Sequence, residues 1–239
     1  MSRLEGQTAV VTGATSGIGR AISLVLAREG AGLGLVGRDR ERLQEVARTA
    51  GMSSPGVVAL PTDLALTAEA EGLAQQIEEK LGGVDILVFC AGVYSRGTLE
   101  TAPLSDLDSH LQVNLRAPVQ LTRMLLPALI ARQGQVVFMN SSVGAAPGVG
   151  FYSASKHALK AFTDTLRAEV NPSGVRVLSV YPGRTATPMQ ESIFAAEGRS
   201  YDPSRLLQPG DVAEMVLAAL CLPRTAEVTD LHIRPMQKS

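Results

Sequence analysis

Short runs of apolar and β-branched residues recur along the whole chain, and longer stretches with helical periodicity separate them. The runs are continuously apolar rather than alternating, which is typical of strands buried on both faces of a parallel sheet. The predicted strands are Thr8–Thr12, Leu33–Val36, Val57–Leu60, Ile86–Cys90, Val136–Met139, Val175–Val180 and Val228–Ile233. The stretches between them predict helices over Ile18–Glu29, Arg40–Ala50, Ala68–Lys80, Leu104–Ala131, Ser153–Val170 and Val212–Leu220.

The alternation of strands and helices along the chain predicts an α/β fold. Seven strands joined by crossovers are typical of one doubly wound parallel sheet with helices on both faces. No linker rich in Pro, Gly or Ser divides the chain, so we expect a single domain over residues 1–239. Glycines follow the ends of four predicted helices, where they favour a left-handed C-cap: Gly30, Gly51, Gly82 and Gly134.

The only long segment without a clear pattern is residues 182–209, which follow the sixth predicted strand. Ligands of open α/β sheets bind beyond the carboxyl ends of the strands, and a long connection there can close over them. We therefore expect residues 182–209 to form a lid over a substrate rather than a plain surface loop.

Composition narrows the functional class. The chain is 45% hydrophobic and 19% charged with a net charge of −1, which gives no reason to expect nucleic acid or an anionic membrane as a partner. Cys90 and Cys221 form no CxxC or Cys/His cluster, so neither a disulfide framework nor a metal site is expected. No apolar run has the length of a membrane span or a signal peptide, so we expect a cytoplasmic protein.

The segment TGATSGIG, Thr12–Gly19, ends the first strand and opens a helix. Gly13 suits a tight turn, Gly17 lets the backbone approach a pyrophosphate, and Gly19 allows close packing of helix on strand. The free amides and the dipole at the helix start would hold the phosphates, and the alternative is a glycine-rich turn without a ligand. The predicted cofactor-binding residues of this segment are Gly13, Thr15, Ser16, Gly17, Ile18 and Gly19.

The choice of cofactor is expected at the end of the second strand, LVGRDRERL. A site for NAD(H) places a carboxylate there to accept from the ribose 2′-hydroxyl, whereas a 2′-phosphate requires an arginine. Gly37 stands where the acid is expected and Arg38 follows it, while Asp39 is expected to cap the next helix. The sequence therefore favours NADP(H) over NAD(H).

Further motifs occur in order, each after the proper predicted strand. They are Asp63-Leu64, Ala91-Gly92, Asn114 in VNLRAP, Ser141, YSASK at Tyr152–Lys156 and YPGRTAT at Tyr181–Thr187. With TGATSGIG, these motifs make the chain resemble the short-chain dehydrogenase/reductase family over essentially its full length. The resemblance implies a Rossmann-type fold and hydride transfer between NADP(H) and a carbonyl or secondary alcohol substrate.

The resemblance implies a catalytic set of Asn114, Ser141, Tyr152 and Lys156, and the chemistry supports it. Tyr152 and Lys156 lie one helical turn apart and share a face. A tyrosine pKa of about 10 must fall by roughly three units to act as a base near neutral pH, and a nearby ammonium favours the phenolate. Tyr152 would then be the general acid in reduction and the base in oxidation, with Ser141 orienting the substrate oxygen.

The remaining roles rest on the resemblance alone. Asn114 resembles the family asparagine that kinks its helix and holds a water in the proton relay. Lys156 resembles the family lysine that binds the nicotinamide ribose together with Tyr152. Asp63 and Leu64 resemble contacts to adenine, although a helix-cap or turn role is equally open for Asp63. Further cofactor contacts are implied for Ala91, Gly92, Pro182, Gly183, Thr185 and Thr187.

The sequence departs from the family pattern at three places. Cys90 stands where the family usually has asparagine, and a small core residue is favoured there over a reactive thiol. Ser141 lies eleven residues before Tyr152, a short spacing that leaves Ser142 as a rival for the catalytic serine. The last strand lacks the usual glycine-rich end, in a part that often joins subunits. The resemblance nevertheless implies a homodimer or homotetramer that packs the helix near 104–131 and the Tyr152 helix across a two-fold axis.

The expected substrate pocket is lined by uncharged side chains on the loops after strands four to six. The candidates are Tyr94, Val143, Ala145, Val149, Phe151, Met189 and Phe194, with Arg96 and Arg184 expected to face solvent. This indicates a small-to-medium, uncharged carbonyl or alcohol substrate. A serine hydrolase is disfavoured, because Met139 stands where a nucleophile elbow requires glycine. An NADP(H)-binding regulator without significant turnover is the alternative function.

Overall fold

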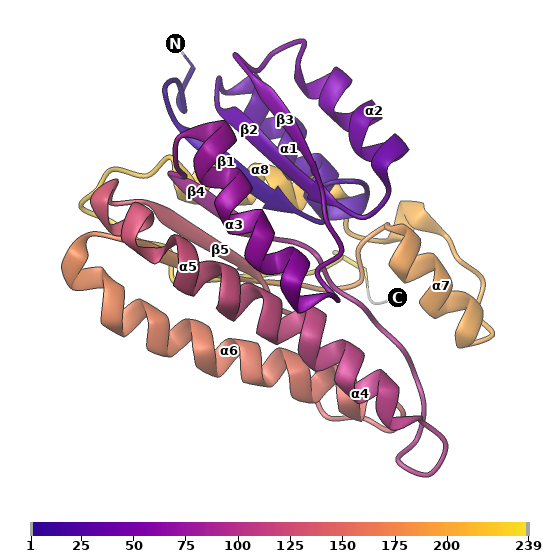
Figure 1. Cartoon of the computed structure of the whole chain (residues 1–239). Helices are drawn as coiled ribbons and strands as arrows, with labels where there is room; N and C mark the ends of the chain where they lie inside the picture. The colour runs from indigo at the N-terminus through magenta and orange to yellow at the C-terminus, as the bar shows by residue number, and fades with distance from the viewer. Residues whose placement is uncertain (1, 238–239) are drawn as a thin grey trace.

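The computed structural model describes residues 2–237 and shows the predicted fold (Figure 1). The strands are β1 Thr8–Thr12, β2 Gly32–Gly37, β3 Val57–Pro61, β4 Ile86–Phe89, β5 Gln135–Met139, β6 Arg176–Pro182 and β7 Asp230–Ile233. The α-helices are α1 Gly17–Arg28, α2 Arg40–Ala50, α3 Thr67–Leu81, α4 Leu104–Leu111, α5 Ala117–Ala131, α6 Gly150–Val170, α7 Pro188–Ala196 and α8 Pro209–Leu220. All strand pairs are parallel, in the order β3-β2-β1-β4-β5-β6-β7.

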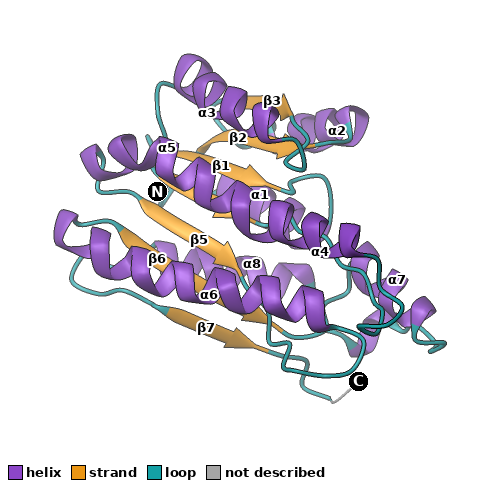
Figure 2. Ribbon diagram, turned by 60° about the horizontal axis from the view of Figure 1, so that its bottom comes forward, coloured by secondary structure: helices purple, strands orange, loops and turns teal. Residues whose placement is uncertain are grey.

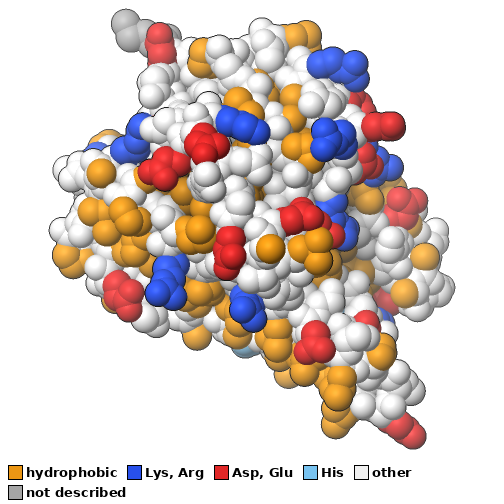
Figure 3. Space-filling view, in the orientation of Figure 1, with side chains coloured by type: hydrophobic (Ala, Val, Ile, Leu, Met, Phe, Trp, Pro, Cys, Tyr) orange, Lys and Arg blue, Asp and Glu red, His pale blue; other side chains and the backbone are white. Residues whose placement is uncertain are grey.

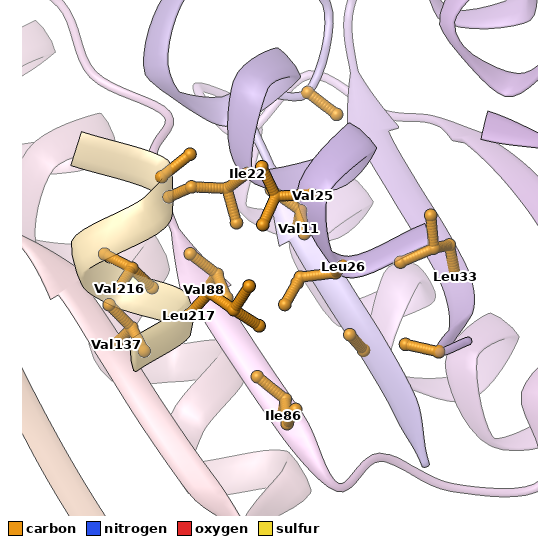
Figure 4. Close-up of a cluster of buried hydrophobic side chains, with 14 of the residues drawn as sticks. Val11, Ile22, Val25, Leu26, Leu33, Ile86, Val88, Val137, Val216 and Leu217 are labelled. Carbon is orange, nitrogen blue, oxygen red and sulfur yellow. The ribbon is translucent and has the colours of Figure 1, made fainter. Parts of the chain in front are cut away.

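Helices cover both faces of the sheet, as the apolar runs predict. In Figure 2, α6 lies in front of the strands and α8 behind them. One core joins the sheet to α1, α2 and α8, through side chains such as Ile22 and Leu217 (Figure 4). The other joins it to α3, α5 and α6, through Leu73, Leu121 and Leu166. Each fully buried aliphatic side chain contributes about 1.5–3 kcal/mol, so these two layers fix the strand ends that carry the site.

The predicted left-handed helix caps are confirmed at two glycines and wrong at two. Gly30 and Gly82 have φ of +84° and +67°. Gly51 has φ of −63° because the chain continues there in a right-handed turn. Before β5 the positive φ belongs to Gln133, at 47°. Gly134 is needed there for space instead, since a Cβ on it would lie 2.8 Å from the Asp85 carbonyl oxygen.

The helix predicted over Leu104–Ala131 has the predicted extent but is interrupted. A π-helical turn, Gln112–Arg116, separates α4 from α5 and contains Asn114. Such turns insert an extra residue into the helical ladder and occur frequently at functional sites. The local geometry at Asn114 thus agrees with the distortion that the family resemblance implies.

The sequence predicts an irregular segment over residues 182–209, and this prediction is wrong. It contains α7 and a 3₁₀ turn at Pro203–Arg205. Thr187 accepts a hydrogen bond from the amide of Gln190, and Pro188 occupies the first helical position, so both N-terminal signals of a helix are present. In Figure 1, α7 stands apart from the sheet, on the side of the carboxyl ends of the strands.

The surface carries both signs of charge. On the face in Figure 3, Lys and Arg side chains are interspersed with Asp and Glu, in keeping with the net charge of −1. Among the helices of residues 2–237, none combines the length and apolarity that crossing a bilayer requires.

Candidate active site

A cavity of about 700 Å³ lies at the carboxyl ends of β1 to β6. It gathers nearly every residue singled out from the sequence. The predicted residues that line it are Gly13, Thr15, Ser16, Gly17, Ile18, Gly19, Arg38, Asp63, Leu64, Ala91, Gly92, Ser141, Tyr152, Lys156, Pro182, Gly183, Thr185 and Thr187. Asn114 lies behind the wall, where a Cβ on Gly92 would be 3.3 Å from its Oδ1 atom.

The three glycines of the first loop are required by backbone geometry. Gly13 has φ of +67°, and a Cβ on it would lie 2.7 Å from the amide nitrogen of Ala91. Gly17 has φ of +51°, and a Cβ on Gly19 would lie 2.3 Å from the carbonyl oxygen of Gly13. The loop leads directly into α1, whose first amides have no partner within the helix. This narrow cradle at a helix N-terminus fits the pyrophosphate of a dinucleotide.

The end of β2 has little space for a side chain at Gly37 and places Arg38 in the cavity wall. A Cβ on Gly37 would lie 2.7 Å from Cγ2 of Thr15, so a carboxylate side chain does not fit there without movement. Asp39 accepts a hydrogen bond from the amide of Arg42, which confirms its predicted role as the cap of α2. Arg38 lines the cavity, and it forms no ion pair with any other residue in 2–237.

Asp63 lines the cavity and also stabilises the turn that follows β3. Its Oδ1 atom accepts from the amide of Ala65 at 3.0 Å. The N-cap position of α3 belongs to Leu66, so the helix-cap reading of Asp63 is wrong. Leu64 is buried beside it and lines the same wall.

Tyr152 and Lys156 share the first turns of α6, which begins at Gly150, three residues earlier than predicted. The Lys156 Nζ atom lies 5.9 Å from the centre of the Tyr152 ring and donates to the carbonyl oxygen of Met139 at 2.8 Å. Burial lowers the pKa of Lys156 to about 8.

Burial also raises the pKa of the Tyr152 phenol, and a hydrogen bond with the Ser141 hydroxyl opposes that rise only in part. The predicted depression of the tyrosine pKa by the neighbouring ammonium is therefore absent in the protein alone. In this state the phenol is protonated, which is the form a general acid requires.

The two candidate serines make different contacts. The Ser141 hydroxyl faces the Tyr152 phenol and accepts from the amide of Val143 at 3.1 Å. The Ser142 hydroxyl instead donates to the carbonyl oxygen of Pro182 at 3.2 Å. The contact with the tyrosine favours Ser141 for a role in the reaction and leaves Ser142 bracing the loop after β6.

Asn114 ties the wall of the cavity together. Its Oδ1 atom accepts from the Val93 amide at 2.9 Å, and its Nδ2 atom donates to the Val93 carbonyl and to Ser155 Oγ, each at 3.1 Å. The side chain is buried. Its amide is thus committed to holding the loop after β4 against α6, the helix of Tyr152 and Lys156.

Cys90 follows β4 and packs partly buried against the core. Burial raises the pKa of its thiol to about 12, opposed by the Lys156 charge. A thiol that stays protonated near neutral pH is a poor nucleophile, so the contacts favour the predicted packing role.

The substrate end of the cavity differs from the prediction. Tyr94, Val143, Ala145, Val149 and Met189 line it as expected, but Phe151 and Phe194 do not. Phe194 is buried under two guanidinium groups, with the Arg184 and Arg199 Cζ atoms 4.9 and 4.8 Å from its ring centre.

The expectation of an uncharged lining is also wrong. Arg96, Arg184 and Glu197 all line the cavity, and Glu197 was missed altogether. Helical spacing is the signal that could have found it, because Met189, Ile193 and Glu197 recur every four residues and all line the cavity. Because the sequence prediction has no helix in residues 182–209, it does not indicate that Glu197 faces the cavity.

Comparison with known proteins places this geometry in a family. The family model described as short chain dehydrogenase matches residues 7–198. The chain belongs to the short-chain dehydrogenase family. It is 34% identical over 241 residues to an uncharacterized oxidoreductase of Staphylococcus aureus (strain USA300), covering 99% of this chain and 100% of that protein. A short chain dehydrogenase from Burkholderia cenocepacia J2315, solved in complex with NADP, is 32% identical with a TM-score of 0.85, covering 97% of each chain.

Another relative is much longer. The chain is 37% identical over 239 residues to glycine betaine reductase ATRR of Emericella nidulans, covering 97% of this chain but spanning only 19% of that protein. The similarity therefore concerns one part of the fungal protein.

Family membership makes this short-chain dehydrogenase an oxidoreductase that acts on small molecules with a nicotinamide dinucleotide cofactor. It does not favour the alternative of a binding protein without turnover.

Proposed function

We propose that this short-chain dehydrogenase transfers a hydride between NADP(H) and a small-to-medium carbonyl or secondary alcohol, with Tyr152 as the general acid and base. The observation that carries the proposal is the meeting of Ser141, Tyr152 and Lys156 in one cavity with the glycine cradle of α1. The uncharged substrate expected from the sequence is not retained, because charged side chains line the substrate end.

The cofactor, when bound, supplies or accepts the hydride. Ser141 donates its hydroxyl hydrogen to the substrate oxygen and orients the carbonyl toward Tyr152. In reduction, the protonated Tyr152 phenol gives its proton to that oxygen as negative charge develops on it. Lys156 lies one helical turn after Tyr152, is held in place by the Met139 carbonyl of β5, and stabilises the phenolate that remains. In oxidation, the same groups act in reverse.

The pKa values of the protein alone set different pH demands for the two directions. Burial raises the pKa of the Tyr152 phenol, so the acid form required for reduction is present through the neutral range. Oxidation requires the phenolate, and positive charge from Lys156 and from the oxidised cofactor must lower that pKa first. We therefore propose that oxidation requires a more alkaline pH than reduction.

NADP(H) is proposed over NAD(H) because of the end of β2. Arg38 would hold the 2′-phosphate with paired hydrogen bonds, and the Thr15 methyl group occupies the space of a side chain at Gly37. Asp63 and Leu64 would flank the adenine, and Tyr152 and Lys156 the nicotinamide ribose, while Asn114 braces the cavity wall behind them. Pro182, Gly183, Thr185 and Thr187 would hold the carboxamide. Helix α7, within residues 182–209, would then close over the substrate as a lid.

We also propose that the enzyme is a homo-oligomer. Leu104, Met124 and Ile130 on α4 and α5 are exposed apolar side chains at 70%, 43% and 38%. These lie on the helices that the family resemblance places at a two-fold axis. Light scattering coupled to size exclusion is expected to show a dimer or tetramer, and a monomer at micromolar concentration would contradict this.

The test of the proposed function follows NADPH and NADH absorbance in the presence of aldehydes and ketones, with the Tyr152→Phe variant as control. Oxidation of NADPH that is lost in the variant is the expected result. Tight binding of NADPH without turnover of any carbonyl would instead support the regulatory alternative, and binding of neither cofactor would contradict both.

A further inference from the structure

One carboxylate at the substrate end of the cavity is surrounded by three guanidinium groups. Glu197 Oε1 accepts from Arg96 Nη1 at 3.0 Å and from Arg184 Nη2 at 3.0 Å. Its Oε2 atom accepts from the same Arg184 nitrogen at 2.9 Å and from Arg199 Nη1 at 3.2 Å. We call Arg96, Arg184, Glu197 and Arg199 the arginine cluster.

The cluster is assembled from three separate segments. Arg96 belongs to the loop after β4, Arg184 follows β6, and Glu197 and Arg199 stand at the end of α7. Arg96, Arg184 and Glu197 line the cavity, while Arg199 lies behind them against Phe194.

The cluster carries a surplus of positive charge. Burial alone would raise the pKa of Glu197, but the hydrogen bonds and charges of Arg184 and Arg199 outweigh it and hold the pKa below its usual range. Glu197 is therefore ionised at neutral pH, and three arginines against one glutamate leave a net charge of +2.

The cluster also holds unused hydrogen-bond donors. A guanidinium has five N–H groups, and Arg184 Nη1 is buried without a partner among residues 2–237. Leaving a buried donor unsatisfied costs about 1–3 kcal/mol. Arg96 is half-exposed, and its one hydrogen bond within the described residues is the contact to Glu197. Arg96 thus has accessible donors left for an anion in the cavity, whereas the enclosed Arg184 Nη1 atom reaches an anion only after a movement of its side chain.

The cluster is built from other segments than the proposed phosphate contacts of the cofactor. Arg96 lies two residues after Tyr94, whose ring centre is 5.0 Å from that of Tyr152, the proposed proton donor. The proposed phosphate contacts, the glycine cradle of α1 and Arg38, are supplied by β1 and β2 instead. A positive group beyond Tyr94 on the loop after β4 would face the part of a bound substrate that lies away from its carbonyl.

We propose that the substrate carries a carboxylate at the end distal to its carbonyl, bound by Arg96 and Arg184. This inference rests on the proposed function and names the substrate class of that same site. A planar carboxylate matches the paired donors of a guanidinium, and it would neutralise part of the surplus charge around Glu197.

The test compares pairs of aldehydes that differ only in charge. 5-Oxopentanoate and 6-oxohexanoate are each assayed with NADPH beside their methyl esters, which have the same chain and no charge. The wild-type kcat/KM is expected to favour the carboxylate by about tenfold or more, which corresponds to about 1.4 kcal/mol. Because the interaction is between charges at a cavity open to solvent, the preference is expected to fall as salt is added.

Variants that lower or raise the positive charge of the arginine cluster distinguish recognition of a charged substrate from a structural role in holding α7. Arg96→Met and Arg184→Met are each expected to lower the carboxylate-to-ester ratio by about fivefold or more, and Arg184→Lys to restore part of it. Glu197→Gln raises the net charge of the cluster, and it is expected to raise the ratio. Arg48→Met, the same change on an exposed arginine of α2 outside the cavity, is the matched control. A purely structural cluster would change the efficiencies for carboxylate and ester together and leave the ratio alone.

The outcomes distinguish the two claims. Reduction of the esters as efficiently as the carboxylates by the wild type, or a ratio unmoved by both arginine variants, would overturn the inference and leave the proposed function standing. Absence of turnover with all four aldehydes and with simple neutral aldehydes and ketones would overturn the proposed function and this inference with it.

Discussion

The two ends of the cavity are built in different ways. The cofactor end consists mainly of backbone, with glycines at positions 13, 17 and 19 that leave no room for a side chain and a helix that starts beside them. The substrate end consists of side chains from the loops after β4 and β6 and from α7, which meet only in the folded chain. The first end suits an invariant dinucleotide, and the second can change with the substrate while the fold stays the same.

The largest expected effect on folding and cofactor binding comes from a substitution in the glycine loop at the cofactor end. Gly19→Ala places a Cβ 2.3 Å from the Gly13 carbonyl oxygen, so the loop must move. Overpacking of this kind is expected to cost about 3 kcal/mol in the free energy of unfolding and to weaken NADPH binding by more than about 100-fold. Urea unfolding and fluorescence titration measure the two effects.

Gly72→Ala is the matched control, because Gly72 lies inside α3 with nothing within 4 Å of its Cβ position. It is expected to stabilise the protein by about 0.5–1 kcal/mol, since alanine is the better helix former. Unaltered cofactor binding by Gly19→Ala would show that the cradle does not depend on this contact.

The contrast between the two ends also explains what the sequence could predict. The glycine loop, Tyr152 and Lys156 lie within short segments, where spacing alone places them on one turn or one helix face. The substrate end has no such local signal: Glu197 meets Arg96 across 101 positions of sequence. Phe194 was assigned to the pocket because it is apolar, but its place in α7 turns it into the packing beneath Arg184. The pKa of Tyr152 depends on burial, which residue spacing does not reveal.

The next effect tests which serine acts in the reaction, at the place where the cofactor end and the substrate end meet. Ser141→Ala removes the hydroxyl that faces Tyr152 and is expected to lower kcat by about 100-fold or more, the usual effect of losing one oxyanion donor. Ser142→Ala removes only a hydrogen bond to the Pro182 carbonyl, and it is expected to lower kcat by less than about fivefold. Steady-state kinetics with a saturating carbonyl decide, and a larger loss in Ser142→Ala would reverse the assignment.

Arg38→Asp tests whether a side chain, rather than backbone, selects the cofactor at the first end. A carboxylate there would repel a 2′-phosphate and accept from a 2′-hydroxyl. The ratio of kcat/KM for NADPH to that for NADH is expected to fall by about 100-fold, or about 2.7 kcal/mol. Arg42→Asp on α2, whose guanidinium pairs with Asp39, is the matched control. An unchanged ratio in Arg38→Asp would remove the case for NADP(H).

The smallest effect is on the free energy of unfolding, which the burial of Lys156 in the reacting centre lowers. Lys156 has a folded pKa of about 8, below its ordinary value of 10.5, so between these values the unfolded chain binds more protons and wild-type stability rises with pH. Lys156→Met is therefore expected to be more stable than wild type at pH 7, by about 1–2 kcal/mol, after the loss of the hydrogen bond to Met139.

That advantage is expected to shrink by pH 9.5, as urea unfolding at the two pH values would show. Lys160→Met serves as the control, because Lys160 lies on the same helix but is exposed and paired with Asp164. An advantage of Lys156→Met that grows with pH would have the wrong sign for a buried lysine.

Tyr152 is proposed to supply the proton to the substrate, and two phenylalanine variants test this proposal. Tyr152→Phe and Tyr94→Phe each remove one phenol oxygen, from rings whose centres are 5.0 Å apart in the same cavity. NADPH-dependent carbonyl reduction is expected to fall by about 1,000-fold in Tyr152→Phe and by less than about tenfold in Tyr94→Phe, with NADPH affinity in both within about tenfold of wild type. Turnover by Tyr152→Phe above a tenth of the wild-type rate, or an equal loss in the two variants, would contradict the account.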